Sequence, residues 1–362
     1  MNATQVIHDR GQSIWLDNIT RELLDSGTLQ RYINDLSVTG LTSNPTIFHQ
    51  AISKSQAYDA DIGRLLEQGK SGEDLFFEIA IADLKHAASH FRPVYDRTCG
   101  VDGYVSLEVS PLLAFDTDSS RKSAAELHAR AAIPNLLIKI PGTSEGLQAI
   151  EDSIFAGIPI NVTLLFSREQ YLLAAEAYLR GIERRIAAGL KPDVASVASV
   201  FVSRWDAAVA NNVPESLRNR LGIAIARRIY KAYCDLLASP RWQRTFNAGA
   251  RPQRLLLAST GTKDPKASDI LYVRSLTAPY TVDTMPEATL RATADHGELD
   301  PIMPRDGGDC EDTLSEFAKA GVDIDAVAAK LQTDGAASFA KSWNELLAVI
   351  ESRSTSLQVA HL

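Results

Sequence analysis

Short apolar runs alternate with longer segments of helical spacing along this 362-residue chain, and this alternation restricts the fold more than any other feature. The apolar runs, which have the length and composition of buried strands, lie at 12–16, 38–42, 103–109, 136–140, 158–166, 193–202, 254–259 and 280–283. Segments with helical periodicity follow at 21–35, 73–90, 120–132, 144–154, 168–186, 217–236 and 268–276, with a further helix from residue 286. Eight strands separated by helices predict an α/β fold, the (β/α)8 TIM barrel, with additional N- and C-terminal helices.

The C-terminal part of the chain departs from this alternation, because only helices are expected after about residue 309. Phe339, Trp343, Leu346 and Ile350 form one apolar stripe there. No linker rich in Gly, Pro or Ser divides the sequence. We therefore expect one α/β barrel domain over residues 1–362, in which 309–362 is a helical extension. Such an extension could pack across the base of the barrel or form a subunit contact, and the oligomeric state stays open.

Composition narrows the class of protein. The chain is 45% hydrophobic and 23% charged, and no apolar run is long enough to cross a bilayer. Residues 1–10 lack the apolar core of a signal peptide, so we expect a cytoplasmic protein without a membrane partner. A net charge of -8 argues against nucleic acid as a partner. The three cysteines lie far apart and the histidines show no ligand spacing, so no metal site is expected.

A lysine interrupts one of the apolar runs. Lys139 lies within Leu-Leu-Ile-Lys-Ile at 136–140, and Pro141 and Gly142 end the strand at once, so Lys139 should face the loop beyond it. An apolar wall disfavours the ammonium form, and a neutral amine can attack a carbonyl group to form a Schiff base. The competing interpretation is a lysine at the rim that only makes an ion pair.

Other polar residues also fall where strands end. In barrels, the reacting groups come from the C-terminal ends of the strands and the loops that follow them. The residues expected at that end are Asp17, Asn44, Glu108, Lys139, Asn161, Thr163, Ser199, Arg204 and Ser259, with Lys263 in the loop after the seventh strand.

An amine with carboxylates nearby suits covalent carbonyl chemistry, in which a protonated imine is the electron sink and no metal is needed. Structural roles are open at the same positions. Asp17 could cap the helix that follows it, Glu108 could merely neutralise Lys139, and Asn44 before Pro45 could belong to a turn.

Cations and hydroxyls after the sixth and seventh strands suggest a phosphate clamp. Arg204, Ser259 and Lys263 lie on the loops where barrels often hold phosphate. The competing interpretation is a pair of solvated surface cations.

Several motifs resemble those of the transaldolase family, in its longer bacterial form. They are Trp-Leu-Asp at 15–17, Thr-Ser-Asn-Pro at 42–45, Leu-Glu-Val at 107–109, Ile-Lys-Ile at 138–140 and Asn-Val-Thr-Leu-Leu-Phe-Ser at 161–167. Their order and approximate spacing match the family from about residue 13 to about residue 297. The resemblance implies a TIM barrel and a cofactor-free transfer of a dihydroxyacetone unit in the pentose phosphate pathway. Sedoheptulose 7-phosphate would be the donor and glyceraldehyde 3-phosphate the acceptor.

The resemblance also implies a role for each matched residue. Lys139 forms the Schiff base, and Asp17 takes the hydroxyl proton that triggers cleavage. Glu108 assists formation and hydrolysis of the imine through a water beside Thr163. The remaining residues would bind substrate: Asn44, Asn161 and Ser199 hold hydroxyls of the three-carbon unit, while Arg204 and Ser259 hold the phosphate.

The sequence differs from familiar family members at two places near the residues expected to bind phosphate. Familiar members carry Ser-Pro-Phe-Val-Gly-Arg where residues 199–204 read Ser-Val-Phe-Val-Ser-Arg. They also carry an arginine shortly after the position of Ser259, whereas here Ser-Thr-Gly-Thr at 259–262 leads to Lys263. A lysine binds phosphate as a point charge, without the two-pronged geometry of arginine. Two alternative functions remain: a fructose 6-phosphate aldolase-like enzyme that releases free dihydroxyacetone, and a barrel that binds sugar phosphates without catalysis.

Overall fold

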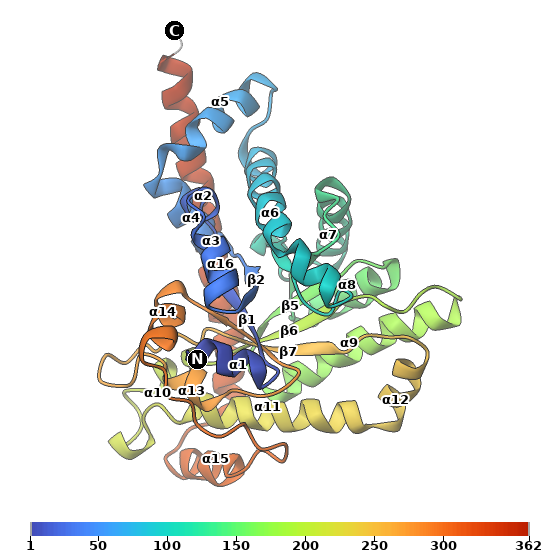
Figure 1. Cartoon of the computed structure of the whole chain (residues 1–362), viewed down its shortest axis with the longest axis vertical. Coiled ribbons are helices and arrows are strands. Elements are labelled where there is room, and N and C mark those ends of the chain that lie inside the picture. Colours follow the sequence, from blue (N-terminus) through green and yellow to red (C-terminus); the bar gives the residue numbers. More distant parts are fainter. Residues whose placement is uncertain (1, 361–362) are drawn as a thin grey trace.

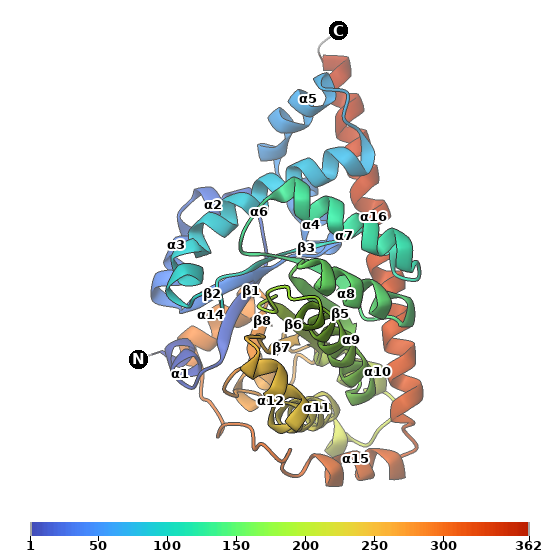
Figure 2. The ribbon, with the colours of Figure 1, turned by 90° about the vertical axis from the view of Figure 1, so that its right-hand side faces the viewer.

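The computed structural model describes residues 2–360, and its eight strands form the closed parallel barrel that the sequence predicts (Figure 2). The strands are β1 (Ser13–Asp17), β2 (Val38–Thr42), β3 (Val105–Glu108), β4 (Leu136–Pro141), β5 (Ile160–Leu165), β6 (Ser196–Phe201), β7 (Gln253–Ala258) and β8 (Val282–Met285). Each boundary lies within three residues of the expected one. Because all neighbouring pairs are parallel, every strand ends at the same edge of the barrel.

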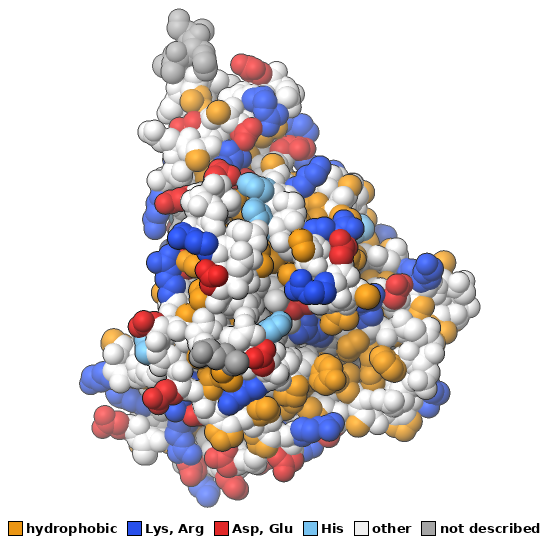
Figure 3. Space-filling model, in the orientation of Figure 1, with side chains coloured by type: hydrophobic (Ala, Val, Ile, Leu, Met, Phe, Trp, Pro, Cys, Tyr) orange, Lys and Arg blue, Asp and Glu red, His pale blue; other side chains and the backbone are white. Residues whose placement is uncertain are grey.

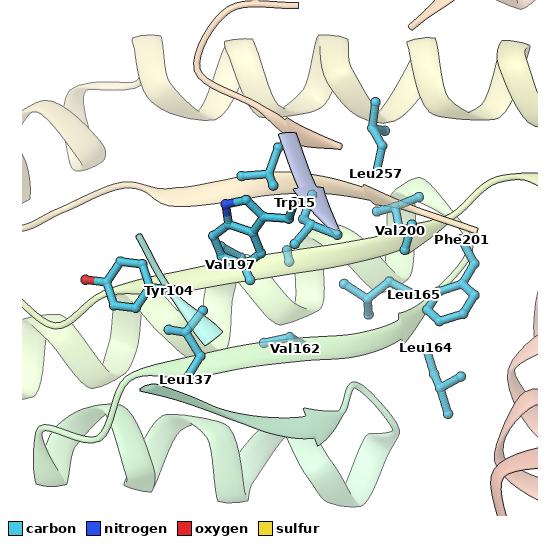
Figure 4. Packing of buried hydrophobic residues seen from close by; sticks show 14 of the residues in the cluster. Trp15, Tyr104, Leu137, Val162, Leu164, Leu165, Val197, Val200, Phe201 and Leu257 are labelled. Atoms are coloured by element: carbon cyan, nitrogen blue, oxygen red, sulfur yellow. The ribbon is translucent and has the colours of Figure 1, made fainter. Parts of the chain in front are cut away.

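Large apolar side chains fill the part of the barrel near the strand N-termini (Figure 4). The rings of Trp15 and Tyr104 lie 6.5 Å apart, and Leu137 and Val197 are buried with them. Gly40 on β2 makes room for the indole, because a Cβ atom there would lie 2.5 Å from Trp15 Nε1. This apolar filling makes this part of the barrel a packed core.

The interior becomes polar toward the strand C-termini. Residues two apart on a strand face the same side, so Asp17, Lys139 and Ser199 follow the interior residues Trp15, Leu137 and Val197. The strand alternation therefore carries polar side chains to one end of an otherwise apolar barrel.

Helices surround the barrel. They are α1 (Ala3–Asp9), α2 (Arg21–Asp25), α3 (Thr28–Asp35), α4 (Pro45–Lys54), α5 (Asp59–Glu67), α6 (Gly72–Arg97), α7 (Thr117–Ala131), α8 (Ser144–Ala156), α9 (Arg168–Ala187), α10 (Ser203–Val209), α11 (Leu221–Ala238), α12 (Pro240–Asn247), α13 (Leu271–Ser275), α14 (Glu287–His296), α15 (Cys310–Lys319) and α16 (Ile324–Ala360), with short 3-10 helices at Gln56–Tyr58, Pro111–Leu113 and Glu215–Leu217. The helix expected at 21–35 is instead two, because Gly27 between them is left-handed at φ 75°.

The C-terminal helix α16 passes from α15, alongside the barrel, to the far end of the molecule beside α5 (Figures 1 and 2). It contacts α4, α5, α6, α10 and β5. The Gln332 side chain on α16 bonds backbone groups at the exits of β4 and β5, so the helix crosses the C-terminal end of the barrel. The expectation that it could cross the base is therefore wrong. Of the extension expected at 309–362, residues 361 and 362 lie outside the described part.

Positive and negative side chains are intermingled over the face shown in Figure 3. Between residues 2 and 360, no helix combines the length and the apolar character that a membrane span requires.

Candidate active site

A cavity of about 350 Å³ opens at the C-terminal end of the barrel, where the sequence places the polar residues. Eight of the ten candidate residues line it: Asp17, Asn44, Lys139, Thr163, Ser199, Arg204, Ser259 and Lys263. The other two, Glu108 and Asn161, are buried beside it and contact residues of the lining. The strand ends thus bring all ten to one place.

Lys139 and Glu108 form a buried pair on adjacent strands. The two residues are register partners in β4 and β3, and Lys139 Nζ lies 3.1 Å from Glu108 Oε2. Lys139 Nζ also donates to the carbonyl of Ser43 at 3.3 Å. The side chains are only 6% and 3% exposed, so a lysine at the rim is excluded.

The Glu108 carboxylate is poorly satisfied for a buried charge. Its contact with Lys139 lacks hydrogen-bond geometry, and among the described residues neither oxygen has a hydrogen-bond partner. Burial raises the pKa of Glu108, and the positive charge of Lys139 opposes that rise. A carboxylate with a raised pKa next to an amine can accept and return a proton.

Asp17 ends β1, which only β2 separates from β3, and it lines the same cavity as Lys139. Thr42 Oγ1 donates to Asp17 Oδ1 at 2.8 Å. Burial raises the pKa of Asp17, while Lys139 and the Thr42 hydrogen bond act against the rise. The alternative interpretation of Asp17 as a helix cap is wrong, because the hydroxyl of Thr20 caps α2.

Asn161 and Ser199 are linked beneath the cavity. Ser199 Oγ donates to Asn161 Oδ1 at 2.7 Å, and Asn161 Nδ2 donates to Ser106 Oγ at 3.1 Å. Asn161 is also the register partner of Lys139 on β5. This chain of hydrogen bonds fixes the orientation of the amide beside the lysine.

Thr163 and Asn44 present polar groups to the cavity itself. Thr163 is fully buried, and its Oγ1 has no hydrogen-bond partner among the described residues. Asn44 caps α4 by accepting from the backbone N–H of Ile47 at 3.0 Å, and it also lines the cavity. Asn44 is therefore the N-cap of a helix and not part of a turn, and this role does not exclude contact with a ligand.

Arg204 is held between aromatic rings. Its guanidinium carbon lies 5.0 Å from the centre of the Phe201 ring and 5.7 Å from that of Phe339. Burial lowers the pKa of Arg204, and the charges of Glu108 and Asp17 oppose that change. The interpretation of Arg204 as a solvated surface cation is therefore wrong.

Ser259 and Lys263 complete this side of the cavity. Ser259 adopts a left-handed conformation at φ 56°, and its hydroxyl lies 2.9 Å from that of Ser203. Lys263 lines the cavity but is exposed. Backbone strain of this kind is found most often where a loop is shaped for a ligand.

Other lining residues were missed because their sequence pattern indicates only structure. Phe339 belongs to an apolar stripe that is indistinguishable from core packing, and Gln50 lies on α4, whose face toward the cavity no local pattern reveals. Thr42 and Thr284, whose hydroxyls lie 2.6 Å apart, are ordinary strand residues. Their position at strand ends was the one available signal.

The described residues contain no group of three or more His, Cys, Asp or Glu side chains arranged to hold a metal ion. The ionisable groups of the cavity are instead two carboxylates, a buried lysine and two further cations.

Known proteins resemble this chain over most of its length. Residues 14–350 match the model of the family described as transaldolase/fructose-6-phosphate aldolase. A transaldolase of a Parafrankia species is 44% identical over 350 residues, covering 94% of this chain and 95% of that protein. A transaldolase of Thiobacillus denitrificans is 42% identical over 358 residues, covering 97% and 100%, respectively. That of Thermobifida fusca is 44% identical over 352 residues, covering 95% and 96%. The chain therefore belongs to the transaldolase/fructose-6-phosphate aldolase family.

Proposed function

We propose that this protein is a transaldolase, which transfers a dihydroxyacetone unit from sedoheptulose 7-phosphate to glyceraldehyde 3-phosphate through a Schiff base on Lys139. The observation that carries the proposal is the buried Lys139–Glu108 pair, with Asp17 on the same cavity. These groups supply a nucleophile, a proton acceptor beside it and a second carboxylate, which are the parts that the reaction requires.

Glu108 prepares Lys139 for attack. A carboxylate 3.1 Å from the ammonium group can take its proton and leave the neutral amine, and the raised pKa of Glu108 favours that transfer. The amine adds to the keto carbon, and the oxygen then departs as water after protonation. Glu108 returns the proton through a water held near Thr163, whose buried hydroxyl has spare hydrogen-bonding capacity.

Asp17 then breaks the carbon–carbon bond. It takes the proton of the hydroxyl next to that bond, the aldose departs as an aldehyde, and the bonding electrons move into the iminium group to give an enamine. The enamine attacks the aldehyde of the acceptor, Asp17 returns its proton, and hydrolysis frees the product. Burial raises the pKa of Asp17, which makes its carboxylate a stronger base.

The remaining residues bind the two ends of the donor. Asn44, Asn161 and Ser199 hold hydroxyls near Lys139, and they line the cavity or support its lining. Arg204 and Ser259 bind the phosphate, with Lys263 as a second, more exposed cation. Sugar phosphates are therefore the proposed partners, and no cofactor enters the scheme.

Borohydride trapping tests the covalent step. Reduction in the presence of fructose 6-phosphate should add the mass of one reduced dihydroxyacetone unit to the peptide that contains Lys139. The matched Lys139→Met variant should gain no mass. Absence of the adduct in the wild-type protein would support a barrel that only binds sugar phosphates.

A second assay separates the transferase from the aldolase alternative. With sedoheptulose 7-phosphate and glyceraldehyde 3-phosphate, the protein should form erythrose 4-phosphate and fructose 6-phosphate. With fructose 6-phosphate alone, it should release dihydroxyacetone slowly. Sustained release at the rate of transfer would favour the aldolase.

Four further properties are part of the proposal. A single domain is supported by the contacts of α16 with α4, α5, α6, α10 and β5. A cytoplasmic location, the absence of a nucleic-acid partner and the absence of a membrane partner stay predictions from the sequence.

A further inference from the structure

Helix α16 lies outside the eight strand–helix units, yet one side chain reaches two strand exits at once. Gln332 Nε2 donates to the carbonyl of Gly142, just after β4, and to that of Leu164 on β5, both at 3.0 Å. Gly142 N in turn donates to the carbonyl of Thr163 at 2.7 Å. Gln332 thus fixes β4 and β5 next to the positions that carry Lys139 and Thr163.

The β5 exit needs such support. Leu164 adopts a left-handed conformation at φ 58°, and the pairing with β6 shifts register between Val162 and Leu165. The left-handed conformation is unfavourable for leucine and persists only where its surroundings hold it. The Gln332 amide binds the carbonyl of this strained residue, one position beyond Thr163.

One face of α16 continues from Gln332 into the cavity. Gly335 and Phe339 follow at three and seven positions, which places them on the same side of the helix. A Cβ atom at Gly335 would lie 2.9 Å from Leu164 Cδ2 and 3.3 Å from Arg204 Nη1, so glycine permits the close approach. The helix is therefore fitted to the mouth of the barrel.

The ring of Phe339 lies close to both Lys139 and Arg204. Its ring centre lies 5.6 Å from Lys139 Nζ and 5.7 Å from Arg204 Cζ, and the side chain is 4% exposed. The ring therefore keeps water from the flank of the lysine and of the arginine. A transferase must exclude water from the enamine, because an enamine that takes a proton from water no longer bonds to the acceptor.

We propose that α16 works in the reaction: Gln332 is a positioning residue for Lys139 and Thr163, and Phe339 is a wall residue that keeps the enamine from water. This inference rests on the proposed transaldolase function. When the enamine carbon takes a proton from water, hydrolysis of the resulting imine releases dihydroxyacetone and the free amine. Loss of the Phe339 ring should therefore redirect turnover from transfer to release.

The first experiment compares Gln332→Met with Lys330→Ala. Methionine keeps the size of the side chain but donates no hydrogen bond, whereas Lys330 pairs with Asp334 at the exposed surface of the same helix. We expect Gln332→Met to lower kcat by about tenfold or more, since small displacements of reacting groups have effects of this size. KM should stay close to that of the wild type, and Lys330→Ala should match it in both constants.

The second experiment measures the ratio of dihydroxyacetone released to dihydroxyacetone transferred. Phe339→Ala should raise this ratio severalfold, and Phe339→Leu should restore it in part. Leu346→Ala removes a buried residue of the same apolar stripe that does not line the cavity. It should lower the melting temperature without changing the ratio.

Failure of the inference differs from failure of the function. If the wild-type protein transfers nothing and traps no ketose, the proposed function is wrong. If the wild-type protein transfers but Gln332→Met keeps its kcat and Phe339→Ala keeps its ratio, α16 is only a structural brace. A lower melting temperature in both variants with unchanged kinetics would overturn the inference in the same way.

Discussion

The two ends of the barrel treat a buried carboxylate in opposite ways. At the N-terminal end, the Asp102 carboxylate accepts hydrogen bonds from the Ser13 hydroxyl, from Trp15 Nε1 at 2.8 Å and from the N–H of Gly103 at 2.8 Å. Arg254 Nη1 lies 3.9 Å from the same carboxylate and balances its charge. Both oxygens of the Asp102 carboxylate therefore have hydrogen-bond partners.

At the C-terminal end, polar groups are left with spare capacity. Glu108 has one close contact, and Thr163 Oγ1 has none among residues 2–360. Arg204 lies against aromatic rings, which leaves its N–H donors available to a ligand. Unsatisfied buried groups lower stability, and groups of this kind around a cavity can pair with a bound ligand. The difference indicates that one end stabilises the fold and the other reacts, as expected for this architecture.

The largest effect is expected at Lys139. Replacing it by methionine removes the nucleophile, so transfer and trapping should fall below detection. The variant should remain folded by circular dichroism, because Glu108 can take up a proton once its partner is gone. An unfolded variant would mean that the C-terminal end of the barrel also stabilises the fold. The two ends would then not differ in their roles.

Asp17→Asn should lower kcat by roughly a hundredfold to ten-thousandfold, the usual contribution of a general base. The imine should still be trapped with borohydride, because Asp17 acts after the imine forms. Equal loss of trapping would assign Asp17 to an earlier step.

The raised pKa of Asp17 also predicts two dependences on pH. Since the base must be ionised, kcat/KM should fall as pH is lowered through the raised pKa, at a pH above the ordinary value of 3.8. The folded protein binds the proton more tightly than the unfolded chain, so this group lowers stability as pH rises above 3.8. Asp17→Asn should therefore gain more stability relative to the wild type at pH 7 than at pH 4, which chemical unfolding at both values would measure.

Asp102→Ala should lower stability and leave catalysis unchanged, which is the opposite of the result expected for Lys139→Met. Removing one partner of a buried charged network typically costs about 3 kcal/mol or more of unfolding free energy. The folded fraction should keep the kcat of the wild type, because Asp102 lies at the other end of the barrel. Trp15→Phe removes a single donor to Asp102 and should lower stability by about 1 kcal/mol. A fall in kcat with unchanged stability would contradict the division of roles.

The smallest expected effect is a difference in KM between variants of the two cations of the cavity, Arg204 and Lys263. Arg204→Ala should raise KM for phosphorylated substrates about tenfold to a hundredfold, because a buried charged group loses its phosphate contacts. Lys263→Ala should raise it only about threefold, since an exposed charge contributes little. Steady-state kinetics with phosphorylated and unphosphorylated acceptors would test this order. A larger effect at Lys263 would reverse the assignment of the phosphate site.

The barrel could be predicted from the sequence because strand and helix periodicity are local properties. All eight strands were found within three residues at each boundary. The break at Gly27 was missed because apolar spacing continues through residues 21–35 while one left-handed residue ends the helix.

The barrel part of the site was predictable for a related reason. A parallel barrel brings all strand ends together, so the sequence neighbours of strand ends become neighbours in space. Phe339 and Gln332 were not found, because their place depends on a contact between distant segments. The apolar stripe of α16 would look the same in the sequence wherever the helix packed. Its place over the C-terminal end of the barrel is fixed by packing against α4 and β5.

Because α16 is the last helix to be synthesised, its position determines the order in which the site is completed. A ribosome makes all eight strands and all ten candidate side chains before it reaches Gln332. The Lys139 amine therefore gains the neighbouring Phe339 ring only after the barrel strands have been made, and helix α4 gains its contacts with α16 at the same late stage.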